Sequence, residues 1–87
     1  MKEAREKLLK DGFKKVYTWE DKPNEFYKKH NHPYDTKLII LEGSMKITLN
    51  DNILELKSGD EIHIKTNEMH EVTIGKNGCK YLVGEVK

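Results

Sequence analysis

The pattern of hydrophobic and polar positions divides the chain into a short first part and a long second part. In residues 3–11 (EAREKLLKD), acidic residues come early and lysines come late, and Gly12 follows. This order is typical of a helix that ends at a glycine. The apolar residues available for a buried stripe are Ala4, Leu8 and Leu9. We therefore expect one N-terminal helix within residues 1–12 that lies on the surface of the remaining structure.

From residue 13 onward, short segments that alternate between apolar and polar residues, or are rich in β-branched and aromatic residues, are separated by turn signals. The expected strands are 14–20, 25–32, 37–42, 45–50, 53–57, 61–65, 70–74 and 79–86. The expected turns between them include 42–44, 51–52, 57–60 and 75–78. The middle of 37–42 is entirely apolar, which indicates a strand buried on both faces. Many short strands at this spacing predict an all-β sandwich or barrel.

Length and charge limit the range of functions. The 87 residues suit a single domain, 1–87, in which residues 13–87 form the barrel. The charges cancel to a formal +1, and Arg5 is the only arginine. A nucleic-acid surface needs a basic excess and benefits from arginine, so no nucleic-acid partner is expected. Because so small a barrel has a thin margin of stability and exposed strand edges, we expect a homodimer.

The expected compartment is the cytoplasm. No apolar run approaches the roughly 18 to 20 residues that cross a bilayer, so no membrane partner is expected. The N-terminus carries acidic residues and lacks the apolar segment of a signal peptide. Cys79 is the single cysteine and cannot form an internal disulfide. We interpret it as a small buried hydrophobic residue.

Histidines are the candidates for chemistry. His30 and His32 lie two apart in HNHPYDT (30–36), and His63 and His70 follow later. Residues i and i+2 of a strand point to the same face, so the first pair can present two imidazoles to one metal ion. His63 stands between two isoleucines, and we expect it to face away from the core in a structural or exposed position. Glu61 has the same strand parity as His63 and is its expected partner.

The arrangement of these residues resembles the cupin family of small jelly-roll barrels. The first cupin motif reads HxH, three or four residues, Glu, six residues, Gly, and HNHPYDTKLIILEG matches both histidines and Gly43. The second motif begins with Gly and ends in His. GDEIHIKTNEMH matches it at Gly59 and at His70. The resemblance covers about residues 24–74. It implies a double-stranded β-helix and a divalent metal held by His30, His32 and His70.

Two positions depart from the family pattern. Thr36 stands where the cupin motifs have a glutamate ligand, and 65–67 replaces a Pro-x-Gly turn. Asn67 can adopt the left-handed conformation that the glycine would supply, so the turn substitution does little harm to the fold. The missing glutamate removes the anionic ligand. Thr36 has the strand parity of the histidines, and its hydroxyl could hydrogen-bond a metal-bound water.

A site of three neutral nitrogens favours zinc, iron, nickel or copper over manganese as the divalent transition metal. Three further residues are candidates for the pocket or for support of the ligands. Asp35 reaches the site only if the strand bulges. Phe26 shares the parity of the histidines and is the best candidate for a pocket wall. Met69, next to His70, lines the mouth or packs in the core.

Two classes of function remain open. The first is a metal-dependent enzyme that acts on a small molecule, with oxygenase or isomerase chemistry as the resemblance implies. The second is a non-catalytic module that binds or senses a small ligand in the barrel. No catalytic residue stands out, and Asp35 is the only acid–base candidate that the sequence places near the histidines.

Overall fold

The structure, a computed structural model, describes residues 2–86. Its elements are α1 (Lys2–Lys10), β1 (Lys15–Asp21), β2 (Phe26–His30), β3 (Thr36–Leu49), β4 (Asn52–Lys57), β5 (Glu61–Ile64) and β6 (His70–Glu85). Strands dominate and α1 is short, which confirms the predicted all-β class with an N-terminal helix. No helix within the described range is long and apolar enough to span a membrane.

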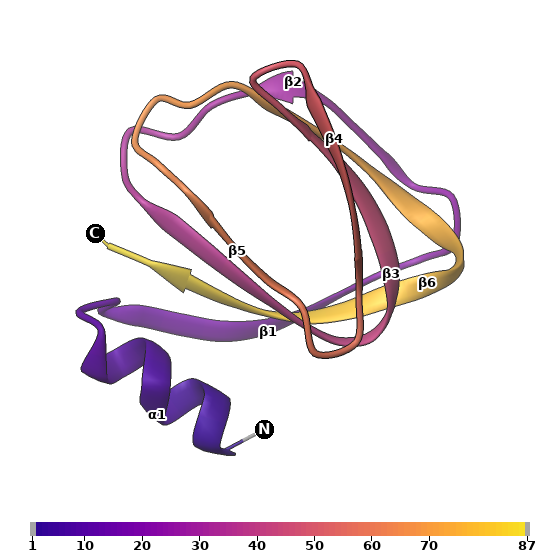
Figure 1. Cartoon of the computed structure of the whole chain (residues 1–87). Helices are drawn as coiled ribbons and strands as arrows, with labels where there is room; N and C mark the ends of the chain where they lie inside the picture. The colour runs from indigo at the N-terminus through magenta and orange to yellow at the C-terminus, as the bar shows by residue number, and fades with distance from the viewer. Residues whose placement is uncertain (1, 87) are drawn as a thin grey trace.

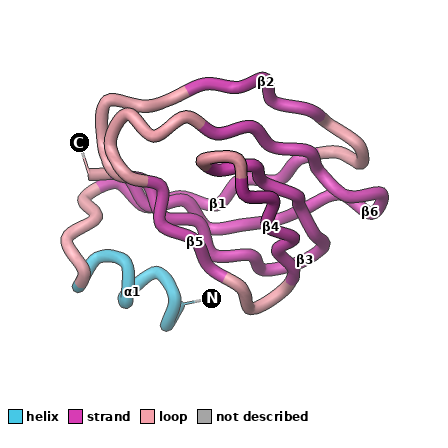
Figure 2. The backbone as a smooth tube through the Cα atoms, turned by 45° about the horizontal axis from the view of Figure 1, so that its top comes forward, coloured by secondary structure: helices cyan, strands magenta, loops and turns pink. Residues whose placement is uncertain are grey.

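Two long strands, β3 and β6, organise the barrel (Figure 1). They pair with each other along most of their length, and each contributes to two layers. In one layer, the end of β6 lies between β1 and the beginning of β3, which also pairs with β5. In the other layer, the beginning of β6 lies between β2 and the end of β3, which also pairs with β4. The two layers enclose the core, as in the predicted jelly roll (Figure 2).

The predicted turns at 42–44 and 75–78 are wrong, because β3 and β6 run through them. The expected strand pairs on either side merge into single strands, with register shifts on both sides of the bend in β3. Gly43 and Gly78 adopt φ values of 79° and 78°, which favour glycine. A Cβ on Gly43 would come within 2.0 Å of the Gly78 carbonyl oxygen. These glycines therefore mark bends where the two strands approach closely, and not chain reversals.

The tight turns follow the expected chemistry with a small shift. Asn50 and Asp51 both have positive φ, 50° and 68°, and connect β3 to β4 as a two-residue hairpin loop. The turn therefore lies one residue earlier than predicted. Asn67 has a φ of 62°, which is the left-handed conformation expected where the cupin pattern has glycine.

The core has two parts, which explains the apolar run in β3. Leu38 and Ile40 point into the barrel and join the main core, whereas Ile39 points outward. On the outer face, Ile39 packs with Leu82 of β6 and with Leu8 of α1. The middle of 37–42 is thus buried on both faces, as predicted, because α1 covers that side of the layer (Figure 1).

Only part of the predicted apolar stripe of α1 is buried. Leu8 has no exposed surface, whereas Leu9 is 50% exposed. A Cβ at Gly84 of β6 would lie 3.2 Å from Leu8 and from Phe13, so glycine leaves room for the helix. The helix is therefore attached through Leu8, with Ala4 packed against the same cluster and Lys7 paired with Glu61.

Candidate metal centre

Three histidines meet at one end of the layer that contains β2, the beginning of β6, the end of β3 and β4. His30 ends β2 and His70 begins β6, and the two are partners across the antiparallel ladder. His32 follows two residues after His30. The three side chains each offer a nitrogen, and these nitrogens lie within 4.8 Å of one another. The ring centroid of His70 lies 4.2 Å from that of His30 and 5.2 Å from that of His32.

Backbone carbonyls select the tautomer that two of these rings adopt when neutral. His30 Nδ1 lies 2.5 Å from the Lys28 carbonyl oxygen, and His70 Nδ1 lies 3.0 Å from the Glu68 carbonyl oxygen. A carbonyl only accepts, so in each ring Nδ1 carries a hydrogen, and in the neutral ring Nε2 keeps its lone pair. A bond from the second ring nitrogen to a carbonyl is the support that metal-ligating histidines have in proteins. The donor set therefore fits a nitrogen-preferring divalent metal.

Burial favours the neutral form of His70. Its side chain is only 3% exposed. Burial lowers the pKa of His70 below its usual value of 6.5, and the nearby His30 and His32 lower it further, whereas the carbonyl and carboxylate of Glu68 act in the opposite direction. Desolvation is the largest of these causes. At neutral pH the imidazole is therefore in the form that can bind a metal.

The histidines line a cavity of about 340 Å³ inside the barrel. Thr36 also lines it, as its strand parity predicts, and is 5% exposed. The Thr36 hydroxyl oxygen is buried and has no hydrogen-bond partner within the described part of the chain. The aromatic residues of the cavity wall are Tyr17, Trp19, Tyr27 and Tyr81. Polar histidines and aromatic rings thus share one cavity.

A buried carboxylate holds three of the aromatic residues in place. Asp21 is 5% exposed and accepts hydrogen bonds from Trp19 Nε1 at 2.9 Å and from Tyr81 Oη at 2.6 Å. Tyr27 Oη donates to the same carboxylate. Burial, followed by the bond to Asp21, raises the pKa of Tyr27 to about 12, and the same two causes raise the pKa of Tyr81. Both phenols therefore stay protonated and act as donors.

Glu85, which the sequence analysis did not select, places a carboxylate in the histidine cavity. It is 7% exposed, lines the cavity, and is the cross-strand partner of Thr36. Tyr17 Oη donates to Glu85 Oε2 at 2.8 Å, and Tyr34 Oη lies 3.4 Å from the same oxygen. The Tyr34 ring stacks on His32 with 5.4 Å between centroids. Strand alternation could have found Glu85, because Tyr81, Val83 and Glu85 share one face of β6.

Asp35, the acid that the sequence places near the histidines, does not line this cavity. Its carboxylate accepts from Thr66 N at 2.8 Å and Thr66 Oγ1 at 2.7 Å, and lies 3.2 Å from His63 Nε2. The bonds to Thr66 are the main reason that the pKa of Asp35 is lowered. Nearby, Asn67 N donates to the His32 carbonyl at 2.7 Å. Asp35 thus ties the loop after β2 to the turn before His70.

Neither Phe26 nor Met69 lines the cavity, contrary to expectation. Phe26 is 55% exposed and Met69 is 41% exposed. The register of β2 shifts between Tyr27 and His30, so Tyr27 and not Phe26 shares the cavity with the histidine. Met69 lies immediately before the first residue of β6 and is exposed. The hydrophobic pattern does not show the bulge in β2, so the pattern assigned the cavity-facing position of this strand to Phe26 in place of Tyr27.

His63 lies outside the histidine group, as its position between two isoleucines predicts. Its ring contacts Phe13 edge to face at 5.8 Å, and its side chain is about half exposed. The expected partner Glu61 instead forms ion pairs with Lys7 at 3.2 Å and Lys37 at 3.0 Å. These pairs are the main reason that the pKa of Glu61 is lowered.

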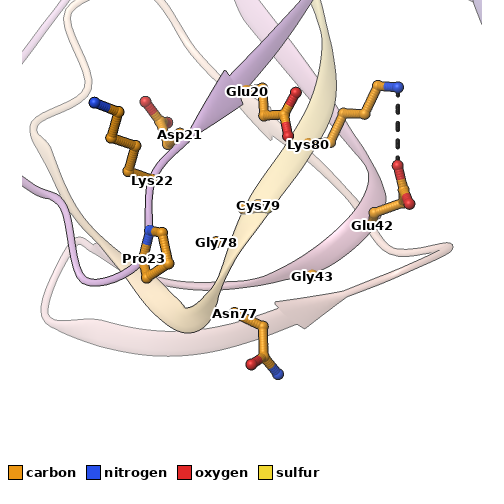
Figure 3. A pocket seen from close by; sticks show the side chains of 10 residues that line it. All are labelled: Glu20, Asp21, Lys22, Pro23, Glu42, Gly43, Asn77, Gly78, Cys79 and Lys80. Carbon is orange, nitrogen blue, oxygen red and sulfur yellow. Dashed lines mark ion pairs between the residues drawn. The ribbon is translucent and has the colours of Figure 1, made fainter.

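A second hollow of about 470 Å³ lies where the end of β1 meets the bends of β3 and β6 (Figure 3). Its charged residues include Lys80, whose Nζ lies 3.8 Å from a carboxylate oxygen of Glu42. Cys79 is buried here, and burial raises the pKa of its thiol to about 11. None of the described residues that line this hollow is a histidine. The described residues of this hollow therefore bring no imidazole nitrogens together.

Comparison with known proteins identifies the family. No curated protein matches the chain. The polyketide cyclase RemF from Streptomyces resistomycificus has a similar structure, with 29% identity and a TM-score of 0.71, over 83% of this chain and 54% of that one. A cupin-2 domain protein from Shewanella frigidimarina has 22% identity and a TM-score of 0.71, over 83% and 69%. The DMSP lyase DddQ from Ruegeria pomeroyi has 20% identity and a TM-score of 0.74, over 80% and 36%.

The present chain thus spans about half the length of RemF and about a third of DddQ. The family model for the cupin domain matches residues 17–83, which is more than half of the chain and includes all three clustered histidines. The histidine motif, the barrel topology and this match agree. The chain belongs to the cupin family.

Proposed function

We propose that this protein is a metal-dependent cupin that holds one divalent transition metal through His30, His32 and His70 and acts on a small molecule in the adjoining cavity. The observation that carries the proposal is the convergence of three histidine nitrogens within 4.8 Å on the wall of a 340 Å³ cavity. Three protein ligands are the number found in catalytic sites, where a further position stays open to water or substrate.

The donor set defines the chemistry. When bound, the metal would act as a Lewis acid that polarises a substrate oxygen and acidifies water. Three neutral imidazoles leave its charge uncompensated, so anionic oxygen groups are the favoured ligands. A cavity of 340 Å³ lies at the small end of the range of about 300–1,000 Å³ for ligand pockets. The similar structures named as a polyketide cyclase and a DMSP lyase support catalysis on small molecules in this fold.

Metal analysis of single-histidine variants tests the proposal. The purified protein is loaded with zinc, passed through a desalting column without chelator, and analysed by mass spectrometry for metal per chain. We expect about one zinc per wild-type chain and almost none in His70→Ala. His63→Ala is the matched control, because His63 lies outside the cluster and should leave the zinc content unchanged. Absence of stoichiometric metal in the wild type, or equal zinc content in His70→Ala, would overturn the proposal.

A further inference from the structure

The histidine cavity has a second chemical character, separate from the histidines. Among the described residues that line it, Glu85 is the only carboxylate, and no lysine or arginine is present. The Glu85 side chain is 7% exposed and accepts a hydrogen bond from Tyr17, whose pKa is raised, mainly by burial, so that the phenol stays a neutral donor. A carboxylate thus borders the cavity, and Lys15 Nζ lies 5.6 Å from the centroid of the Tyr17 ring.

Aromatic rings accompany this carboxylate. Tyr17, Trp19, Tyr27 and Tyr81 line the same cavity. The face of an aromatic ring carries negative electrostatic potential and attracts organic cations, and tryptophan does so most strongly. Proteins that recognise quaternary ammonium groups use such clusters of aromatic rings. The cavity therefore combines a carboxylate with the ring types that bind an ammonium group.

The aromatic wall is held by its own hydrogen bonds. Trp19, Tyr27 and Tyr81 donate to Asp21, which is 5% exposed. Rings fixed in this way lose little conformational freedom when a ligand binds, so the wall is preorganised. The three rings are therefore in place before a ligand binds.

We propose that the cavity selects a small zwitterion, with an organic ammonium group beside Glu85 and the aromatic rings and an anionic oxygen group toward the three histidines. The anionic half rests on the proposed metal site. The ammonium half rests only on Glu85 and the aromatic wall, so the two halves can be tested separately.

The ammonium half is tested on metal-free protein with a pair of probes of equal shape. Choline carries a trimethylammonium group, and 3,3-dimethylbutan-1-ol replaces it by a neutral tert-butyl group. Isothermal titration calorimetry should show about tenfold tighter binding of choline, from its contacts with Glu85 and the rings. Equal affinity of the wild-type protein for the two probes would overturn the proposal, and this result depends on no variant.

Two substitutions then locate the effect. Glu85→Gln should remove most of the preference for choline. Glu55→Gln, an exposed carboxylate on β4 outside the cavity lining, makes the same change of charge and should keep the preference. Trp19 is 49% exposed, so Trp19→Leu is expected to fold even if Glu85→Gln does not, and it should weaken choline binding severalfold. A choline preference that survives both Glu85→Gln and Trp19→Leu would refute the assignment.

The anionic half is tested with glycine betaine, which adds a carboxylate to the trimethylammonium group. We expect betaine to bind more tightly than choline in the zinc-loaded protein and to lose this advantage when zinc is removed. If the protein binds no zinc, the proposed function fails while the choline result still decides the ammonium half. If zinc binds and betaine has no advantage over choline, the zwitterion is the wrong ligand class.

Discussion

The two hollows of the barrel differ in a way that shows where chemistry lies in this fold. The hollow in Figure 3, of about 470 Å³, is lined by exposed or half-buried charged groups such as the Lys80–Glu42 pair and by the buried Asp21. The histidine cavity, of about 340 Å³, brings three imidazole nitrogens together inside the barrel. Convergence of binding atoms, and not volume, therefore distinguishes the candidate site.

Asp21 belongs to both regions and connects them. It lines the second hollow, while its three hydrogen-bond donors line the histidine cavity. Both oxygens of Asp21 accept bonds from these donors, which is what a structural carboxylate requires. Glu85 lies instead in the cavity lining beside Tyr17. The comparison predicts that Asp21 serves stability and Glu85 serves ligand binding.

The largest expected effect comes from removing the structural carboxylate. Asp21→Ala should lower the free energy of unfolding by about 3–5 kcal/mol, because it leaves the donors of Trp19, Tyr27 and Tyr81 without their acceptor. Urea denaturation followed by circular dichroism measures the change. Glu20→Ala, an exposed neighbour that also lines the second hollow, is the control and should change stability by less than about 0.5 kcal/mol. A loss below about 1 kcal/mol for Asp21→Ala would contradict the structural role.

The thiol of Cys79, which lines the second hollow, should react slowly with alkylating reagents. The pKa of the Cys79 thiol is about 11, so at pH 8 the thiolate fraction is far below that of a free cysteine, whose pKa is about 8.5. We expect iodoacetamide to react roughly a hundredfold more slowly with the folded protein than with the protein in urea. Mass spectrometry of the alkylated chain over time measures the rates. Similar rates in the two states would show that the hollow exposes a reactive thiolate.

The contributions of Asp21 and Glu85 to stability can be compared by removing one tyrosine hydroxyl that donates to each carboxylate. Tyr81→Phe removes a buried bond of 2.6 Å to Asp21, and we expect a loss of about 2 kcal/mol. Tyr17→Phe removes a bond of 2.8 Å to Glu85 from a half-buried ring, and we expect about 1 kcal/mol. Thermal and urea unfolding of both variants measure the difference. The reverse order would mean that Glu85 carries more of the stability than Asp21 does.

The smallest expected effect concerns Asp35, which ties the loop after β2 to the turn before His70. The folded pKa of Asp35 lies below its usual value of 3.8, so its carboxylate stabilises the fold above pH 3.8 and loses that contribution as the pH falls through the lowered pKa. Asp35→Asn should therefore flatten the decline of the melting temperature below about pH 4. Scanning calorimetry between pH 2 and pH 7 measures the profile. If the melting temperature of Asp35→Asn declined with falling pH as steeply as that of the wild type, Asp35 would not stabilise the loop after β2.

The sequence was enough for the fold class, which depends on local periodicity. The HxH spacing indicated His30 and His32, and the resemblance to the cupin motifs added His70. The predicted strand 25–32 ends at His30 in the structure, so His32 lies just beyond it. The continuity of β3 and β6 could not be predicted in the same way. Gly43 and Gly78 look like turn residues, and only their close approach across the barrel shows that they permit a bend.

Glu85 and the aromatic wall escaped the sequence analysis for a different reason. Whether a strand residue faces the cavity depends on its register with a partner strand. The register shift between Tyr27 and His30 reverses which residues of β2 face the cavity, and the composition of the strand gives no sign of it. Thr36 drew attention because a glutamate was expected there. Its cross-strand partner, Glu85, supplies a carboxylate to the same cavity from the opposite end of the chain.

The pairing of β6 also determines when the barrel can form during synthesis. This strand follows all the other strands in the chain, yet it pairs with β1, β2 and β3. Among the described strands, β3 can pair earlier with β4 and β5, whereas β1 and β2 pair only with β6 and stay unpaired until residues 70–85 have been made. Such long-range pairing predicts folding in milliseconds to seconds rather than microseconds. During that interval the exposed strand edges need protection from aggregation.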